Sequence, residues 1–489
     1  MMDNADRLQD KRFVGVKETV LYGVANGGQV IGYNLVRMQL TFFLMTVFGL
    51  PAKAVMIMIF VLGIWDAVND PIMGSVVDRT RTRFGKLRPY LLFVPIPLGI
   101  ATVFLFGGAE FLKGVESTTT KVIYTWIVYF IWEFFYTIGD IPFWGLSAAI
   151  SPNLKDRSNA ITSARFISGI IGGLTGMLIP VFIDLSTNNI ISWTLSQVFL
   201  FMGILAGTVG MLLFSFAGIF TRERVVQSSQ EPKMLDCFKY MFKNKPLLLL
   251  VLSSVLGTLE GMSDMFSQYY YKLSLGIASL SIIASIPGVI MSFLAYSLIP
   301  WLEKRWSSKR ILINITVFKV VVTGIIFLIG FKFYRDPKII VPLLAIQGVF
   351  TNGIASIKGV IPTKMIGDTV DYMEYKTGER GEGMAFSLLT FISKLAGSLS
   401  TGIAAGIFPL IGLQEVNSQM QLVETGVNTR LWLWALVTVI PAILNLLSLI
   451  PIIFYDLEGE KLETIHKEVA QRREKLSKKM TAEHTTEER

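Results

Sequence analysis

Cysteine and histidine are nearly absent from this chain of 489 residues. The single cysteine, Cys237, excludes an intrachain disulfide. Both histidines, His466 and His484, lie in the charged C-terminal segment, which excludes a histidine metal site and a histidine proton relay inside a membrane. The chain also lacks a phosphate-binding P-loop, a nucleophile–base pair and a set of enzymatic metal ligands. We therefore expect neither an ATP-driven pump nor an enzyme, and no cofactor.

Charge is scarce as well: 17% of the residues are charged and 52% are hydrophobic, with a mean hydropathy of +0.55. A soluble protein of this length needs a more polar surface. The net charge of +9 comes from Lys and Arg between apolar runs, which is typical of membrane topology rather than of nucleic-acid binding. The first apolar run is too long for a cleavable signal peptide. We therefore expect a protein embedded in the lipid bilayer, with no nucleic-acid partner.

Apolar segments of membrane-spanning length recur along the whole chain. Each must be helical, because lipid cannot satisfy free backbone groups. We count twelve, at about 18–48, 52–78, 89–109, 121–149, 160–184, 194–220, 246–271, 276–301, 310–332, 338–365, 383–412 and 430–455. The sequence therefore predicts an all-α membrane protein with twelve transmembrane helices.

Loops rich and poor in basic residues alternate along the chain. The rich loops carry Arg79, Arg81, Arg83, Lys86, Arg88, Lys155, Arg157, Lys304, Arg305, Lys309, Arg310, Lys376 and Arg380. The poor loops carry Lys53, Lys113, Lys121, Lys272, Lys332 and Arg335. The rich loops should face the cytoplasm, so an even number of helices places both termini there, in a bacterial inner membrane.

A polar segment at 221–245 divides the chain into two six-helix halves, 18–220 and 246–455. Residues 1–17 form a polar N-terminus, and the charged tail 456–489 is expected to be a solvated helix or disordered. Residues 166–172 (FISGIIG) resemble residues 391–397 (FISKLAG), and both segments follow an Ile-Pro pair. Two related halves with a central site are typical of secondary transporters.

The second span carries two carboxylates, although ionisable groups in a membrane cost about 2.5–3.5 kcal/mol each on insertion scales. Asp66 and Asp70 share one helix face, where they repel each other unless a cation or proton lies between them. Their oxygen atoms suit Na⁺ or Li⁺, and the Asn69 carbonyl can add another ligand. The alternative is that both carboxylates simply balance nearby arginines at the helix end.

The fourth span carries Thr137, Asp140 and Trp144 on neighbouring positions of one face. A carboxylate beside an indole is a common way to bind a sugar, although Trp144 could instead belong to an interfacial aromatic belt. Arg165 could pair with Asp140, bind substrate hydroxyls or extend to the cytoplasm. Lys394 in the eleventh span could balance the acidic residues.

Two loops could take part in gating. The loop after the second span holds Arg79, Arg81 and Arg83, and the loop after the tenth holds Asp368 and Asp371. Salt bridges between them could close a cytoplasmic gate, or the basic loop could serve topology alone.

These motifs resemble the glycoside–pentoside–hexuronide:cation symporters of the major facilitator superfamily, from about Tyr22 to Leu457. The resemblance rests on residues 65–74 (WDAVNDPIMG), 78–86, 136–144 (YTIGDIPFW) and 367–372 (GDTVDY). It implies a cation site at Asp66, Asn69, Asp70 and Thr137, with Na⁺ on Asp66 and Asp70 if sodium is coupled. It also implies a sugar site at Asp140, Trp144, Arg165 and Lys394.

One position departs from the family pattern. The aspartate that binds galactoside hydroxyls on the first helix of the melibiose carrier corresponds to Val30 here. Gln29 and Asn34 could supply first-helix hydrogen bonds instead, and Lys358 and Arg37 leave a hexuronide or another anionic sugar open. The expected function is symport of a sugar or glycoside with Na⁺, Li⁺ or H⁺ by a monomer; a lipid or drug carrier of the same fold is the alternative.

Overall fold

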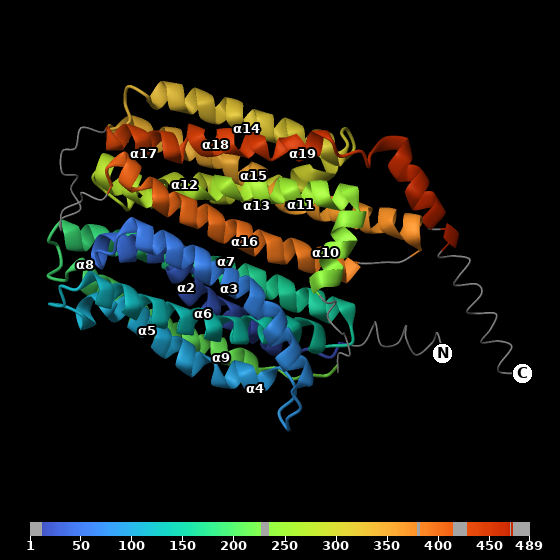
Figure 1. The fold of residues 1–489 in the computed structure, drawn as a ribbon, viewed down its shortest axis with the longest axis horizontal. Coiled ribbons are helices and arrows are strands. Elements are labelled where there is room, and N and C mark those ends of the chain that lie inside the picture. Colours follow the sequence, from blue (N-terminus) through green and yellow to red (C-terminus); the bar gives the residue numbers. More distant parts are fainter. Residues whose placement is uncertain (1–11, 226–233, 379–381, 414–427, 470, 473–489) are drawn as a thin grey trace, which may run out of the picture. The chain divides into compact units, whose positions relative to one another are not determined.

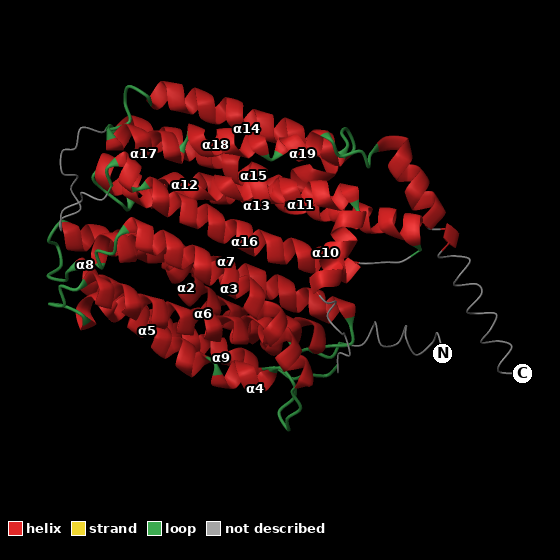
Figure 2. Ribbon diagram, in the orientation of Figure 1, coloured by secondary structure: helices red, strands yellow, loops and turns green. Residues whose placement is uncertain are grey.

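The computed structural model describes residues 12–225, 234–378, 382–413, 428–469 and 471–472. Within them the chain is built from helices and contains no strand (Figures 1 and 2). The β-type pairing found there is an isolated bridge between Thr82 and Gly85. The all-α fold expected from the apolar runs is therefore confirmed. Residues 1–11 of the predicted N-terminus and 473–489 of the predicted tail lie outside the described residues.

The helices before residue 226 coincide with the first six predicted spans. They are α2 (Val16–Phe42), η1 (Phe43–Val47), α3 (Ala52–Arg79), α4 (Arg88–Phe93), α5 (Pro95–Phe111), α6 (Thr118–Ala149), α7 (Leu154–Thr187), α8 (Leu195–Leu205), η2 (Ala206–Gly210) and α9 (Met211–Phe220). Here η1 and η2 are π-helical turns that continue their neighbours. The third predicted span is divided into α4 and α5 at Pro95, which has no N–H to donate.

The later helices begin inside the predicted middle loop. They are α10 (Met234–Lys243), α11 (Lys245–Thr258), η3 (Leu259–Gly261), α12 (Met262–Tyr269), η4 (Tyr270–Ser274), α13 (Leu280–Glu303), α14 (Ser308–Gly330), α15 (Pro337–Thr377), α16 (Glu382–Ile407), η5 (Pro409–Ile411), α17 (Thr429–Val437), α18 (Val439–Leu447) and α19 (Leu449–Ile453). The seventh predicted span is therefore interrupted by the 3₁₀ turn η3 and ends in the π-helical turn η4. Gly257 lies two residues before η3 and Gly261 is its last residue, and glycines are a common cause of helix breaks.

Ten helical runs of the described chain are long and apolar enough to cross a membrane. The run Thr429–Val437 and Val439–Ile453 makes an eleventh if its 47° bend lies within one span. Pro95–Phe111 is a shorter apolar helix. Every predicted span thus coincides with helical structure, while the count of twelve remains a prediction.

The helices gather into two compact units. The first unit consists of residues 1–231, 264–282 and 398–433, and the second of residues 232–263, 283–397 and 434–489. The first therefore contains all of the helices before residue 226 together with short segments from later in the chain. The predicted boundaries 18–220 and 246–455 of two six-helix halves stay a prediction.

Glycine allows the backbones of the first unit to approach closely. A Cβ on Gly28 of α2 would lie 2.3 Å from the carbonyl oxygen of Gly210 in η2. A Cβ on Gly99 of α5 would lie 2.2 Å from the Gly207 carbonyl oxygen. Small residues at helix interfaces are the usual device for such close packing in membranes. α2 and α5 are thus both packed against the α8–η2–α9 run.

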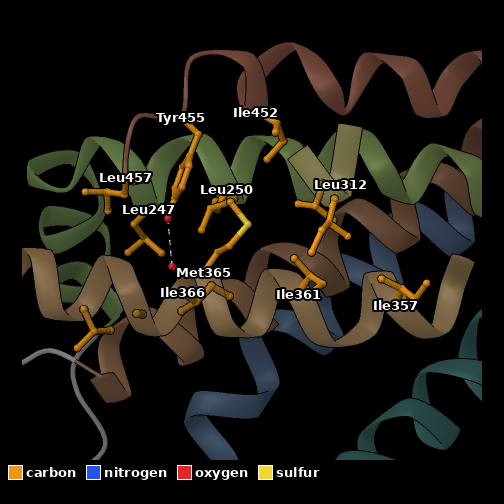
Figure 3. Close-up of a cluster of buried hydrophobic side chains, with 14 of the residues drawn as sticks. Leu247, Leu250, Leu312, Ile357, Ile361, Met365, Ile366, Ile452, Tyr455 and Leu457 are labelled. Carbon is orange, nitrogen blue, oxygen red and sulfur yellow. Dashed lines mark hydrogen bonds between the residues drawn. The ribbon is translucent and has the colours of Figure 1, made fainter. Parts of the chain in front are cut away.

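A hydrophobic cluster forms the core of the second unit (Figure 3). It joins side chains from α11, α14, α15 and α19, among them Leu250, Leu312 and Met365. Tyr455 continues the cluster past α19 and donates a hydrogen bond from its hydroxyl to the Met365 carbonyl oxygen at 3.4 Å.

The first part of the charged tail is a helix at residues 459–469, one of the two expected states, but two of its apolar side chains are buried rather than solvated. Ile465 and Val469 are 3% and 1% exposed and belong to the hydrophobic cluster. Arg472 donates a hydrogen bond to the Tyr375 carbonyl oxygen at 2.8 Å, at the end of α15. The expectation missed this because two apolar residues four positions apart are a weak signal among many charges.

Candidate functional site

Three buried polar side chains meet where α3 packs against α6. Asp66 and Asn69 of α3 are 3% and 1% exposed, and Thr137 of α6 is 1% exposed. Thr137 donates a hydrogen bond from Oγ1 to Asp66 Oδ1 at 3.3 Å. Asp70 is half-buried one turn further along α3. The structure thus brings Thr137 to the carboxylate of Asp66, while the cation-binding role of all four residues, including Na⁺ on Asp66 and Asp70, stays a prediction.

Asn69 has an unsatisfied amide. Its Nδ2 makes no hydrogen bond to any residue that the structure describes. A buried polar group without a partner costs about 1–3 kcal/mol. Such a cost is tolerated most easily at a functional position, where a ligand reorganises the surrounding groups.

Arg37 of α2 lies between two acidic side chains. Its Nη2 is 3.5 Å from Asp66 Oδ2 and 3.9 Å from Glu133 Oε1. The side chains of Asp66 and Glu133 are 4% and 1% exposed, whereas that of Arg37 is 32% exposed. Tyr33, one turn before Arg37, lies 5.4 Å below the guanidinium and stacks on Tyr136 of α6. Three helices thus contribute to one charged cluster.

The predicted sugar site contains a direct contact between α2 and α6. Gln29 Nε2 donates a hydrogen bond to Asp140 Oδ1 at 2.7 Å. Gln29 is buried and Asp140 is half-buried. A carboxylate has about four lone-pair sites, so Asp140 can accept this bond and still accept one from a substrate hydroxyl.

Trp144 and Arg165 form a stacked pair. The Arg165 guanidinium carbon lies 4.6 Å from the centroid of the indole. Arg165 is exposed on α7, so its donors remain available to a ligand. Its pairing with Asp140, its binding of sugar hydroxyls and its extension to the cytoplasm all stay predictions.

Asn34 lies away from this contact. A Cβ on Gly172 of α7 would come within 3.0 Å of the Asn34 amide nitrogen, so Asn34 packs against α7. It lines a groove between α2, α7 and α8 together with Met38 and Thr175. Its role in sugar binding stays a prediction.

The second unit holds several basic side chains within its helices. Lys394 is half-buried on α16, and its functional role stays a prediction. Lys319 of α14 pairs with Glu260 of η3. Lys358 of α15 donates a hydrogen bond to Asn445 Oδ1 at 2.5 Å. Lys358 makes no ion pair with the residues that the structure describes, so its partner is a neutral amide.

Arg81 and Arg83 of the predicted gate lie in the loop after α3, and Arg79 is the last residue of that helix. Asp368 and Asp371 lie within α15 and not in a loop as expected, because this helix continues to Thr377. Glu223 accepts the backbone N–H groups of residues 86–88 at 2.8–2.9 Å, which fixes the loop that carries Arg81 and Arg83. All three arginines are exposed. In the second unit, the tail residue His466 lies 3.3 Å from Asp368 Oδ1 and 3.8 Å from Asp371 Oδ2. Gating by salt bridges between these arginines and aspartates stays a prediction.

A buried ion pair that the sequence analysis does not single out joins α7 to the turn η4. Lys272 Nζ lies 3.0 Å from Asp184 Oδ1 and 2.5 Å from Thr187 Oγ1. Asp184 also accepts the backbone N–H groups of Ala278 and Ser279 at 2.9 and 2.7 Å. We name these five residues the Asp184 clasp. A signal was present, because Asp184 ends an apolar span and Lys272 follows another.

Comparison with known proteins shows the family of the chain. The family model described as MFS/sugar transport protein matches residues 21–459, which include every predicted site residue. The uncharacterized symporter YnaJ of Bacillus subtilis (strain 168) is 29% identical over 94% of this chain and 96% of its own length. The glucuronide carrier protein homolog of Escherichia coli (strain K12) is 27% identical over 87% of this chain and 89% of its own.

Solved structures show the same fold. The crystal structure of a D-xylose-proton symporter has a TM-score of 0.58 at 15% identity and covers 92% of this chain, with 99% of its own chain matched. The resemblance to the glycoside–pentoside–hexuronide:cation symporters is confirmed by the family match. The chain is therefore a multi-pass membrane protein that belongs to the MFS/sugar transport protein family.

Proposed function

We propose that the chain is a cation-coupled sugar or glycoside symporter of a bacterial cytoplasmic membrane. It works as a monomer by alternating access, with residues 18–220 and 246–455 as the moving halves and with both termini in the cytoplasm. The family match and the symporter name of the Bacillus subtilis relative support this proposal. The coupling ion is Na⁺, Li⁺ or H⁺.

The observation that carries the proposal is the use of α6 by both ligand sites. Thr137 contacts Asp66, and Asp140, three residues later on the same helix, contacts Gln29. A cation that binds Asp66 and Asp70 fixes α3 against α6 and thereby positions Asp140 for the sugar. By linkage, the sugar must raise the affinity for the cation by the same factor.

The test is uptake of labelled sugars into proteoliposomes with and without an inward Na⁺ gradient, and then with a proton gradient. Accumulation of one sugar only under a gradient is expected, and Asp70→Cys should abolish the stimulation by the cation. Glu116→Cys, at an exposed loop position, is the matched control and should transport normally. Normal stimulation in Asp70→Cys would show that the cation site is wrongly assigned, and efflux of lipids or drugs without sugar uptake would favour the other carrier class.

A second candidate substrate is an anionic sugar such as a hexuronide. The observation that favours it is the ammonium group of Lys358, which is held by the neutral Asn445 amide rather than by a carboxylate. A sugar carboxylate would supply the missing counter-charge. Uptake of a glucuronide that is lost in Lys358→Met, with uptake of a neutral glycoside unchanged, would identify this substrate class.

A further inference from the structure

The charge arrangement around Arg37 leads beyond the proposed symport, on which it rests. Arg37 lies on α2, Asp66 on α3 and Glu133 on α6, so the contacts join three helices of the first unit. Asp66 belongs to the proposed cation site, whereas Glu133 lies one turn before Thr137 on α6. One guanidinium therefore stands between a proposed cation ligand and a second buried carboxylate.

Both contacts of the guanidinium are loose. The distances of 3.5 Å to Asp66 and 3.9 Å to Glu133 exceed the 2.7–2.9 Å that is usual for a bond between a cationic N–H and a carboxylate. A shift of a few tenths of an ångström would therefore shorten one contact and lengthen the other. The side chain of Arg37 is 32% exposed, so it has room for such a shift, whereas both carboxylates are buried.

We propose that Arg37 is a built-in competitor of the coupling cation for Asp66. Without the cation, the guanidinium supplies the positive charge that the buried carboxylate requires. When the cation binds Asp66, Arg37 moves toward Glu133, which then holds the guanidinium as its main ion pair. No buried carboxylate is left without a counter-charge at any stage, which avoids a penalty that is severe in a protein interior.

This arrangement gives Arg37 and Glu133 opposite effects on cation affinity. Arg37 lowers the affinity, because it must be displaced from Asp66. Glu133 raises the affinity, because it attracts the displaced guanidinium. Since the two residues act through Asp66, they are positioning residues rather than cation ligands.

The decisive variant is the double substitution Arg37→Gln/Glu133→Gln. It removes one positive and one negative charge, so the net charge of the cluster is unchanged. Asp66 then loses the competing guanidinium, and the cation becomes the positive charge that this buried carboxylate attracts. If only the net charge matters, the affinity for Na⁺ should stay at the wild-type value. If Arg37 competes with the cation, the affinity should rise by about tenfold or more.

The measurement is the Kd for Na⁺ and for Li⁺ of the purified, full-length protein by titration calorimetry, without sugar. Besides the tighter binding of the double variant, we expect Glu133→Gln alone to weaken binding by about tenfold and Arg37→Lys to stay within about threefold of wild type. The neutral double variant Asp184→Asn/Lys272→Met is the matched control, because it removes another buried ion pair of the same unit and should leave Kd unchanged.

A wild-type Kd in Arg37→Gln/Glu133→Gln, weaker binding in that variant, or no alkali-ion binding in either protein would overturn the inference. Appearance of binding only in the double variant would support it. Because this titration needs no transported sugar, its result is independent of the uptake test. Sugar uptake with an unchanged Kd would reject the competitor alone, whereas tighter cation binding without sugar uptake would reject the symport of sugars alone.

Discussion

The Asp184 clasp predicts that one substitution will open the end of the protein at which α7 terminates. Asp184 and Lys272 are both 7% exposed, and Asp184 receives an ammonium group and two backbone N–H groups. In Asp184→Asn the Lys272 ammonium would keep its buried position and lose its counter-ion. Removal of one partner of a buried ion pair costs about 3–5 kcal/mol.

This free-energy cost destabilises the conformation in which the clasp is formed relative to the one in which it is broken. In the proposed alternating-access cycle, α7 and η4 belong to different moving halves, so we expect the clasp to break in the conformation that opens this end. The lower figure of about 3 kcal/mol corresponds to a change of about 100-fold in the equilibrium between the two conformations, at about 1.4 kcal/mol per factor of ten. Asp184→Asn should therefore raise the population of the open conformation by about two orders of magnitude if that population is small in the wild type.

A cysteine at position 274 can report this population. Ser274 of η4 is 8% exposed, and its hydroxyl makes no hydrogen bond within the described chain, so Ser274→Cys disturbs little. In a Cys237→Ala background it would be the sole thiol, and its rate of reaction with a hydrophilic maleimide would follow the open fraction. We expect Asp184→Asn to raise this rate by about 100-fold.

Two controls distinguish the effect of breaking the Asp184–Lys272 ion pair from a general destabilisation of the protein. Lys113→Ala breaks the ion pair with Glu110, in which the Lys113 side chain is 70% exposed, and should change the rate by no more than a few-fold. The double variant Asp184→Asn/Lys272→Met removes both charges and should return most of the way to the wild-type rate. A wild-type labelling rate in Asp184→Asn alone would refute the reasoning.

Three further predictions concern other contacts. Gln29→Ala should raise the KM for sugar uptake by about tenfold through loss of the contact with Asp140, and an unchanged KM would remove Gln29 from the sugar site. Gly28→Ala should destabilise the protein by about 1–3 kcal/mol, because its Cβ would meet the Gly210 carbonyl oxygen. Gly169→Ala is the control, because a Cβ there has open space, and equal melting temperatures of the two variants would contradict this prediction. Ile465→Ala should cost about 2–5 kcal/mol by leaving a cavity in the hydrophobic cluster, against almost nothing for the exposed Glu463→Ala, and thermal unfolding of both variants measures the difference.

The fold class could be predicted from the sequence, because each membrane-spanning helix requires a long run of apolar residues. It was weaker where a helix breaks, as in the segment of α11, η3 and α12, since the apolar run there continues through the break. The same limit applies to the count of spans, because length and hydropathy alone do not say whether the bent run Thr429–Val437 and Val439–Ile453 crosses once.

Within the candidate site, the grouping of residues on one helix could be predicted from their spacing, whereas contacts between different helices could not. Residues 66, 69 and 70 share one face by helical periodicity, and this alone predicted their grouping. Gln29 and Asn34 were proposed together, yet five residues correspond to a rotation of about 140°, and Asn34 accordingly faces α7 instead. The ion pairs of Arg37 with Asp66 and Glu133 depend on three separate helices, and no local pattern encodes them.

The docked tail helix has a consequence for biogenesis. Tyr455, Leu457, Ile465 and Val469 complete a cluster whose other members, such as Leu247 and Leu250, are synthesised more than 200 residues earlier. While the ribosome is still translating residues 459–469, part of the apolar surface of α11 and α15 remains uncovered at the end that the tail helix later seals. Maturation of the second unit therefore waits for this segment to emerge. A nonsense mutation between residues 456 and 465 would release a chain with an incomplete core, exposed to quality-control proteases although every predicted span had been made.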